Sequence, residues 1–563
     1  MAQRTVGTCF AHIKQRGRSA FGLCSALQTG RRLQPDGRPA LRCLHTSGVG
    51  QGLLEGLLQT AKSKNPITTQ WYGQAVHETH PELVAKDETT PGIARGEYER
   101  RRQQLLENLA DGSVAFLFSA PMHFVSPHVF HEYRQDSDFY YLTGWNEPDS
   151  AVVLEKSKNA SRGYTMTMFV RPKEPEKELW EGPRSGLEAA VDIFGADEAR
   201  PIDELGKYAK KLVAGDRNRV TGKDWKIYVD LDSERGLTRS SHSNTLAKIL
   251  RREQIGSRVC QLTTLVQRAR LIKSPAEIRL MREANRVSAT AFAETMRACR
   301  PGLCEATLQS VFEYASKMAL VDSSKGGSAV TGCDGAAVVD RSSLTRPAYV
   351  PVFASGEHAL CMHYVQNQSR IKGGELILVD AGAEYAAYAS DLTRTFPVSG
   401  KFSGPQHDLY SALLSVQEQM IRLCHASSGF SLNEIHRHST GALVSELKQI
   451  GFHVSEHDIN RHLCPHHISH YLGMDVHDTI DMTRSQQLEP NMVVTVEPGL
   501  YVPYDSKFPK AFQGIGIRIE DDIVVGNTEA DIENLSRYAP KTVSEIEACM
   551  SRQNACDNTS FTV

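Results

Sequence analysis

Acidic residues placed next to strand-like apolar runs are the feature that most restricts how this chain can fold. Glu497 follows the apolar run 492–496, and Glu520 follows the run 514–519. A carboxylate at such a position is costly to bury unless a cation accompanies it. An ion pair with an arginine such as Arg518 would explain either acid alone. The fold must therefore place a positive charge next to these two carboxylates.

Two aspartates add to this pattern. Asp380 ends the apolar strand 375–380, and Asp391 lies in the return run 385–396. A hairpin centred midway between them, at 385–386, sets the carboxylates opposite each other, with Cβ atoms about 4.5–5.5 Å apart. Two carboxylates that close repel, and one would take up a proton unless a cation lies between them. Taken alone, this pair is weak evidence for a site, because acids in a surface turn explain the spacing more readily.

The histidines of the chain are concentrated in one segment. Four of them, at positions 466, 467, 470 and 477, fall within twelve residues. No His-Glu-x-x-His motif is present, which excludes the zincin type of site. One imidazole with four carboxylates is an oxygen-rich ligand set that suits manganese or magnesium-like ions better than a thiolate zinc site does. A shared metal site explains the four acids and the histidines better than four separate ion pairs.

Residues 1–51 have the composition of a targeting segment. They carry eight basic residues and a single acid, Asp36. Serines and threonines are interspersed, and the run of about 7–15 apolar residues that marks a secretory signal is absent. We therefore expect a mitochondrial transit peptide, and the alternative is a disordered basic tail on a cytosolic protein.

Strand and helix patterns divide the rest of the chain into two domains. We expect a helix over 97–110 and strands at 113–118, 151–154, 164–170 and 225–229, which gives an α/β domain over 52–265. A capping box formed by Ser274 and Glu277, with Pro275 between them, begins a long helix of a second, α+β domain over 266–556. Residues 321–348 are rich in Ser, Gly and Ala and have no periodicity, so we expect an atypical insertion that is disordered or draped over the surface.

Charge, hydropathy and cysteine content exclude several classes of protein. The 64 Lys and Arg residues against 66 Asp and Glu give a net charge of −2, so no basic field indicates a nucleic-acid partner. No apolar run approaches the about 20 residues that cross a bilayer, and we expect a soluble protein with no membrane partner. Twelve cysteines without a Cys-x-x-Cys pair are too sparse for a disulfide scaffold.

Taken in order, the motifs of this chain resemble those of the aminopeptidase P family of pita-bread metallopeptidases, and most closely its mitochondrial Xaa-Pro aminopeptidase branch. The N-terminal half of the resemblance rests on TPGI at 90–93, EYERR at 97–101 and YRQDSDFYYLTG at 133–144. The C-terminal half rests on His363-Tyr364, the two spaced aspartates, HHISHYLGMDVHDT at 466–479, VEPGLY at 496–501 and GIRIEDD at 516–522. The resemblance implies an α+β chain with an N-terminal creatinase-like α/β domain and a C-terminal pita-bread catalytic domain.

Carried over position by position, the resemblance implies a centre of two metal ions. Its ligands would be Asp380, Asp391, His470, Glu497 and Glu520. Asp391 and Glu520 would bridge both ions, Asp380 would hold one ion, and His470 and Glu497 would hold the other. The ions would be two Mn²⁺ per subunit, with other divalent metals as alternatives.

The resemblance also implies residues that act on the substrate. Glu497 would accept a proton, and His363 and His477 would face the substrate as catalytic groups. His466 would line a prolyl pocket, and Tyr349 would contact the substrate. His467 has no counterpart role, and we expect it to be structural. The chain departs from the family pattern at His358, where an Asn is usual.

The implied activity is a metal-dependent Xaa-Pro aminopeptidase that releases the N-terminal residue before a penultimate proline and trims processed mitochondrial protein N-termini. A homodimer in the mitochondrial matrix, with a share in the cytoplasm, is expected. A prolidase-type dipeptidase is the alternative enzyme, because it shares the five ligands. A metal-free peptide-binding module with the same fold is the alternative from another class, although such chains have lost the metal carboxylates that this one retains.

Overall fold

The computed structural model describes residues 71–214, 225–231, 241–322, 330–331 and 337–551 of the chain. The predicted transit peptide, residues 1–51, lies outside the described residues. Within the described ranges, no helix has both the length and the apolar content needed to span a membrane.

A mixed sheet forms the centre of the N-terminal domain. Its strand order is β10 (Val259–Cys260), β9 (Ile227–Tyr228), β3 (Val114–Phe118), β6 (Ala151–Lys156), β7 (Tyr164–Val170) and β8 (Glu198–Pro201). The central strand β3 is buried over nearly its whole length because its sequence, VAFLF, offers apolar side chains to both faces. All four strands and the first helix predicted from the sequence are present, the helix as α2 (Arg95–Glu107).

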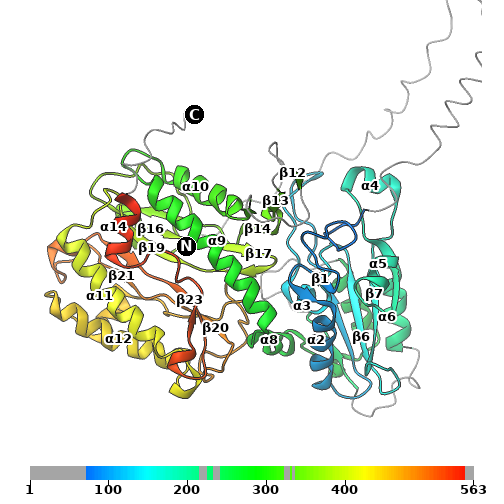
Figure 1. The fold of residues 1–563 in the computed structure, drawn as a ribbon. Coiled ribbons are helices and arrows are strands. Elements are labelled where there is room, and N and C mark those ends of the chain that lie inside the picture. Colours follow the sequence, from blue (N-terminus) through cyan, green and yellow to red (C-terminus); the bar gives the residue numbers. More distant parts are fainter. Residues whose placement is uncertain (1–70, 215–224, 232–240, 323–329, 332–336, 552–563) are drawn as a thin grey trace, which may run out of the picture. The chain divides into compact units, whose positions relative to one another are not determined.

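Helices cover both faces of this sheet. Ala115 and Leu117 of β3 pack in a cluster with side chains of α2 and of α3 (Ser137–Thr143). Val114 and Phe116 point the other way, into a cluster with α6 (Leu205–Ala214) and α7 (Ser241–Arg252). Figure 1 accordingly shows α2 and α6 on opposite sides of β6.

The C-terminal domain begins with the long helix that the capping box predicts. The Ser274 side chain accepts from the Glu277 amide, and the Glu277 side chain accepts from the Ser274 amide, at the start of α9 (Pro275–Ala298). Helix α9 packs on α10 (Glu305–Met318), and α11 (Gly404–Ile421) packs on α12 (Leu432–Gln449) (Figure 1). One hydrophobic core joins these helices to the sheet of β15 (Val352–Ser355), β16 (Leu376–Asp380) and β19 (Thr393–Pro397), and to the sheet of β20 (Val493–Val496), β23 (Asp521–Val524) and β24 (Glu533–Asn534).

The hairpin that carries the two aspartates has a different register from the predicted one. Strands β17 (Ala383–Tyr385) and β18 (Tyr388–Ala389) meet at a two-residue turn, Ala386-Ala387, and both alanines have positive φ. This turn moves the centre of the hairpin by one residue, so Asp380 pairs with Thr393 and not with Asp391. The predicted register is therefore wrong, because alanine in the left-handed region is uncommon and gives no turn signal in the sequence.

Part of the segment 321–348 also differs from its prediction. Strand β11 (Val321–Asp322) pairs with β13 (Ala337–Asp340), and β14 (Thr345–Pro347) adds to the β17–β18 hairpin as its neighbour. Thr345 is buried and donates its hydroxyl hydrogen to the Glu384 carbonyl. The expectation of a loop without regular structure is wrong for residues 337–340 and 345–347. Pairing of β13 with β11, and of β14 with β17, orders their backbone, and such pairing leaves no side-chain periodicity in the sequence. Residues 323–329 and 332–336 lie outside the described residues.

Candidate metal centre

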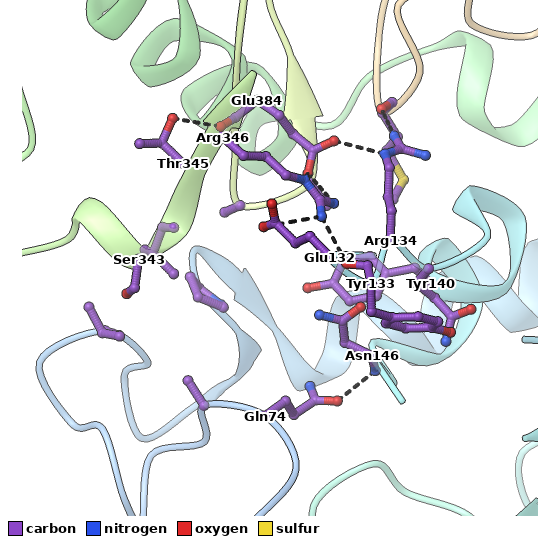
Figure 2. Close-up of a pocket in the computed structure, with 18 of the residues that line it drawn as sticks. Gln74, Glu132, Tyr133, Arg134, Tyr140, Asn146, Ser343, Thr345, Arg346 and Glu384 are labelled. Carbon is purple, nitrogen blue, oxygen red and sulfur yellow. Dashed lines mark hydrogen bonds and ion pairs between the residues drawn. The ribbon is translucent and has the colours of Figure 1, made fainter. Parts of the chain in front are cut away.

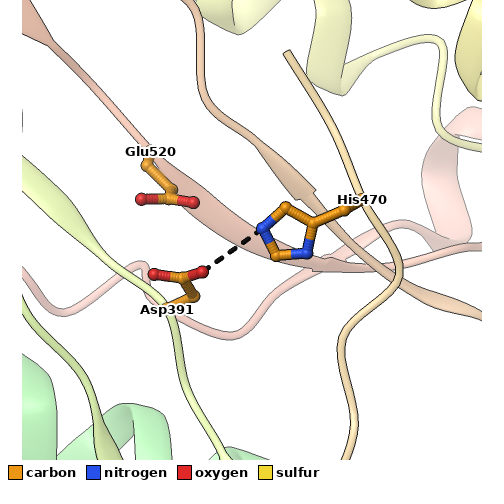
Figure 3. Close-up of side chains that lie close together, drawn as sticks. All are labelled: Asp391, His470 and Glu520. Carbon is orange, nitrogen blue, oxygen red and sulfur yellow. Dashed lines mark ion pairs between the residues drawn. The ribbon is translucent and has the colours of Figure 1, made fainter. Parts of the chain in front are cut away.

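Three of the predicted ligands form a compact buried group. One ligand atom each from Asp391, His470 and Glu520 lies within 4.8 Å of the others. The His470 Nε2 atom is 3.3 Å from an Asp391 carboxylate oxygen, and Figure 3 shows the Glu520 carboxylate beside this pair. All three side chains are buried, so their charges interact with little screening by water.

Backbone pairing fixes the orientation of His470. Its amide donates to the Thr495 hydroxyl, and its carbonyl accepts from the Thr495 amide of β20. The ring atom Nδ1 lies 3.1 Å from the Tyr471 carbonyl oxygen, so Nδ1 carries a hydrogen and Nε2 is the ring nitrogen that faces the carboxylates. A carbonyl that fixes the tautomer in this way is the usual arrangement behind a metal-binding histidine.

The two remaining predicted ligands join the group through shared neighbours. The Tyr349 hydroxyl is 2.6 Å from a carboxylate oxygen of Asp380 and 2.6 Å from one of Asp391. Glu497 Oε1 is 3.6 Å from His470 Nε2, the atom that also faces Asp391. The structure thus brings all five predicted ligands into one connected cluster. Tyr349, which we expected to contact substrate, lies against two of them.

Electrostatics show that the acids crowd one another. Burial raises the pKa of Glu497 to about 7. Burial and the charges of Asp391, Glu497 and Asp380 raise the pKa of Glu520 well above its ordinary value. Burial lowers the pKa of His470, but its bonds to Asp391 and Glu497 outweigh this and raise it to about 9. Four carboxylates with one imidazole are the donor set of a hard divalent cation, and such a cation would relieve this repulsion, so the residues fit a metal.

The ion pair that Arg518 forms is with Asp380, and not with Glu497 or Glu520, the two acids for which such a pair was considered. The Arg518 guanidinium pairs with Asp380 and donates to the Tyr501 hydroxyl at 2.7 Å. The Tyr501 hydroxyl in turn lies 3.1 Å from His466 Nε2. Sequence reasoning assigned no role to Tyr501, although it stands in the VEPGLY segment, and treated Arg518 only as a neutralising charge. Both connect the carboxylates to the predicted prolyl pocket.

Three other histidines, His363, His466 and His477, were predicted to act on the substrate. The exposed His477 ring lies 4.5 Å from the His470 ring, edge to face. Burial lowers the pKa of His466 to about 4, so this ring stays neutral. Burial and the charge of His470 lower the pKa of the His477 imidazole. His363 is exposed, on the loop that follows β15. Of the three, His477 lies against a predicted ligand, where it could donate or accept a proton.

His467 has different neighbours, in line with its expected structural role. Its Nε2 atom is 3.2 Å from the Asn433 side-chain oxygen, and its ring stacks on that of His436 with centroids 4.6 Å apart. Both partners belong to α12, so His467 links the histidine segment to this helix.

The N-terminal domain contributes to the same segment through its YRQDSDF sequence. Arg134 donates to the Met474 carbonyl at 2.7 Å and pairs with Asp475, which lies two residues before His477. Arg134 also shares Glu384 with Arg346, beside a cavity of about 390 Å³ (Figure 2). None of the five predicted ligands lines this cavity. The motif thus contacts the segment that carries His477, through Met474 and Asp475.

Comparison with known families assigns both domains. A model of metallopeptidase family M24 matches residues 279–527, and a model of the aminopeptidase P N-terminal domain matches residues 98–221. These matches fall inside the two predicted domains, 266–556 and 52–265, whose exact bounds stay predictions.

Individual proteins are similar over most of the chain. Xaa-Pro aminopeptidase 3 of Mus musculus is 37% identical over 510 residues, which cover 88% of this chain and 93% of that protein. The mitochondrial intermediate cleaving peptidase 55 of Arabidopsis thaliana is 34% identical over 501 residues, 88% of this chain and 92% of its own. The solved structure of Zn-substituted Escherichia coli aminopeptidase P in complex with product has a TM-score of 0.69 at 34% identity, covering 82% of this chain and 99% of that one.

Proposed function

This chain belongs to metallopeptidase family M24 and is a hydrolase, and we propose that it releases the N-terminal residue from peptides whose second residue is proline. The relatives named Xaa-Pro aminopeptidase and the aminopeptidase P fold support this reaction class. The observation that carries the proposal most is the convergence of four carboxylates and one imidazole on a single buried cluster.

We propose that this cluster would hold two Mn²⁺ ions through the side chains of Asp380, Asp391, His470, Glu497 and Glu520. Two such ions supply a water of lowered pKa and polarise the carbonyl that is to be cleaved. The oxygen-rich donor set favours Mn²⁺ over a metal that prefers thiolates.

The side chains of the chain then manage protons and charge. As the water oxygen adds to the scissile carbonyl carbon, Glu497 accepts the proton that this water releases. His363 and His477 donate hydrogen bonds to the developing oxyanion, and one of them delivers a proton to the prolyl nitrogen as the C–N bond breaks.

Recognition of proline falls to a neutral, mostly buried surface. His466 stays uncharged and is oriented by Tyr501, which is held by Arg518. The amide nitrogen of a proline residue in a peptide carries no hydrogen, so it brings no hydrogen-bond donor into the pocket. The neutral His466 imidazole can therefore lie against the pyrrolidine ring without leaving a buried donor unsatisfied.

We place the enzyme in the mitochondrial matrix, where it trims N-termini exposed when presequences are removed. The basic segment 1–51 and the mitochondrial relative support this location. We also propose a homodimer as the working form.

The test is the turnover of Xaa-Pro-Yaa tripeptides against Xaa-Pro dipeptides, with metal stripped by chelator and restored with Mn²⁺. We expect rapid release of the first residue from tripeptides, little turnover of dipeptides, and loss of both in the stripped enzyme. Preferred cleavage of dipeptides would indicate a prolidase instead, and metal-independent turnover would refute the proposal.

A further inference from the structure

The buried carboxylate of Glu305 links the two ends of the loop that carries His363. This loop, residues 355–369, leaves the end of β15 and returns towards β16. Glu305, the first residue of α10, is fully buried beneath it. Its side chain accepts hydrogen bonds from the Ser355 amide and the Ser369 amide, both at 2.9 Å. Glu305 therefore holds the two ends of the loop together.

The same carboxylate also binds the middle of the loop. The Tyr364 hydroxyl donates to Glu305 Oε2 at 2.9 Å, and His358 Nδ1 lies 3.2 Å from Oε1. The His358 and Tyr364 rings stack, with centroids 4.5 Å apart and planes 14° from parallel. Tyr364 directly follows His363. The two rings and the Glu305 carboxylate therefore fix the backbone immediately after His363.

Glu305 is charged and has few partners able to offset that charge. Burial raises its pKa, but hydrogen bonds from Ser355, Ser369 and His358 outweigh burial and hold the pKa below its ordinary value. Among the ion pairs of the described residues, His358 is the sole titratable base that meets it. A buried carboxylate without a lysine or arginine depends on each of its hydrogen bonds.

The segment 361–366 lies between two buried residues of the loop, Ala359 and Asn367, and is itself mostly exposed. Cys361, His363, Val365 and Gln366 are exposed, and the side chain of Met362 is only partly buried. A catalytic group on such a segment keeps its position only if its neighbours are fixed, because a shift of about 1 Å can cost about 10²-fold in rate.

From this geometry we propose that His358 is a positioning residue for His363, acting by linking Tyr364 to the buried Glu305 carboxylate. The inference rests on the proposed aminopeptidase activity and deepens it by naming what aligns one of its proton-handling histidines. His358 touches neither the metal cluster nor the substrate in this account. Its contribution is the fixed hydrogen bond from Nδ1 to Glu305, which holds this carboxylate in place to accept from the Tyr364 hydroxyl.

Two substitutions separate this role from simple packing. His358→Phe keeps a ring on Tyr364 but removes the donor to Glu305. His358→Asn loses the ring but places an amide nitrogen where Nδ1 stands. Alanine is a poorer choice, because a cavity of about 580 Å³ borders His358 and water could enter to replace the missing donor. A matched control is His407→Phe, since His407 also faces a carboxylate, Asp408, but on the exposed surface of α11.

The variants are compared as Mn²⁺-loaded full-length enzymes by steady-state kinetics on an Xaa-Pro-Yaa tripeptide and by hydrogen exchange over residues 361–366. We expect His358→Phe to lower kcat by about 10- to 100-fold with little change in KM, and to speed exchange in this segment. His358→Asn should recover most of kcat, and His407→Phe should match the wild type. Bound metal should be the same in all four proteins.

The outcomes also separate this inference from the proposed function. If the wild type does not cleave Xaa-Pro peptides, the proposed function fails, and exchange at 361–366 still tests the role of His358. If the wild type is active and His358→Phe leaves both kcat and exchange unchanged, the positioning role is refuted. A rise in KM alone, or equal losses in the Phe and Asn variants, would also overturn it.

Discussion

The crowded carboxylates predict that the metal-free protein loses stability as pH rises, and that metal reverses this trend. Burial raises the pKa of Glu497 from 4.5 to about 7 in the folded chain. A group with a raised folded pKa contributes stability that is present below its unfolded pKa and is lost as pH rises through the folded value. A rise from 4.5 to about 7 corresponds to about 3 kcal/mol of stability, lost between about pH 4.5 and 7.

His470 also contributes stability that is lost as pH rises, at a higher pH than Glu497 does. Its pKa is raised from 6.5 to about 9, so its contribution is lost between those values. Asp391, whose pKa is lowered, changes only on the acid side of this window. Bound cations stabilise the ionised carboxylates and require the unprotonated imidazole, so the metal-loaded protein should not show this loss.

The assay is thermal unfolding of the full chain from pH 5 to 9, with chelator and with Mn²⁺. We expect Tm of the stripped protein to fall across this range and the gain from Mn²⁺ to grow with pH. Glu497→Gln, which cannot ionise, should flatten the stripped curve by an amount equivalent to about 3 kcal/mol. A gain from metal that is constant or shrinks as pH rises would refute the reasoning, as would a Glu497→Gln curve parallel to that of the wild type.

Three further predictions concern single parts of the site. Asp391→Ala or Glu520→Ala should abolish turnover and bind fewer Mn²⁺ ions by elemental analysis, because each residue is proposed to hold both ions; near-normal activity after Mn²⁺ repletion would contradict this. His477→Ala should lower kcat by about 10²- to 10⁴-fold with metal content unchanged, as expected for a positioned proton donor or oxyanion partner, and loss of metal would instead make His477 a ligand. Deletion of residues 323–336 with a short turn in their place should leave Tm and metal binding nearly unchanged, because loop length costs only about 0.6 kcal/mol per doubling. Extending the deletion through β14 (Thr345–Pro347) should lower both, because β14 pairs with β17 and leads into Tyr349; equal behaviour of the two deletions would show that β14 is dispensable.

Local signals account for what could be predicted of the fold. The capping box at Ser274 and the apolar strand at 114–118 are encoded by neighbouring residues, and both are present in the structure. The hairpin register is not encoded in this way. It depends on an Ala386-Ala387 turn with positive φ, a conformation that alanine rarely adopts and that composition does not mark.

In the candidate site, the residues could be predicted from the sequence but the contacts between them could not. Acids at strand positions and clustered histidines stand out because burying them is costly, and for that reason sequence reasoning finds them. The connections between them are long-range: Tyr349 reaches Asp380 and Asp391 from the link between β14 and β15, and Arg518 reaches Tyr501. No spacing in the sequence predicts such contacts, because they exist only once the sheets have packed.

The proposed function requires that the cluster bind the metal ions on which peptide cleavage depends. The most direct measurement is a titration of the chelator-stripped enzyme with Mn²⁺, following tripeptide turnover and bound metal in the same samples. We predict no turnover without metal and an activity that rises to its plateau at two equivalents per chain. Turnover in the stripped enzyme, or two bound equivalents that leave the enzyme inactive on every Xaa-Pro-Yaa peptide, would contradict it.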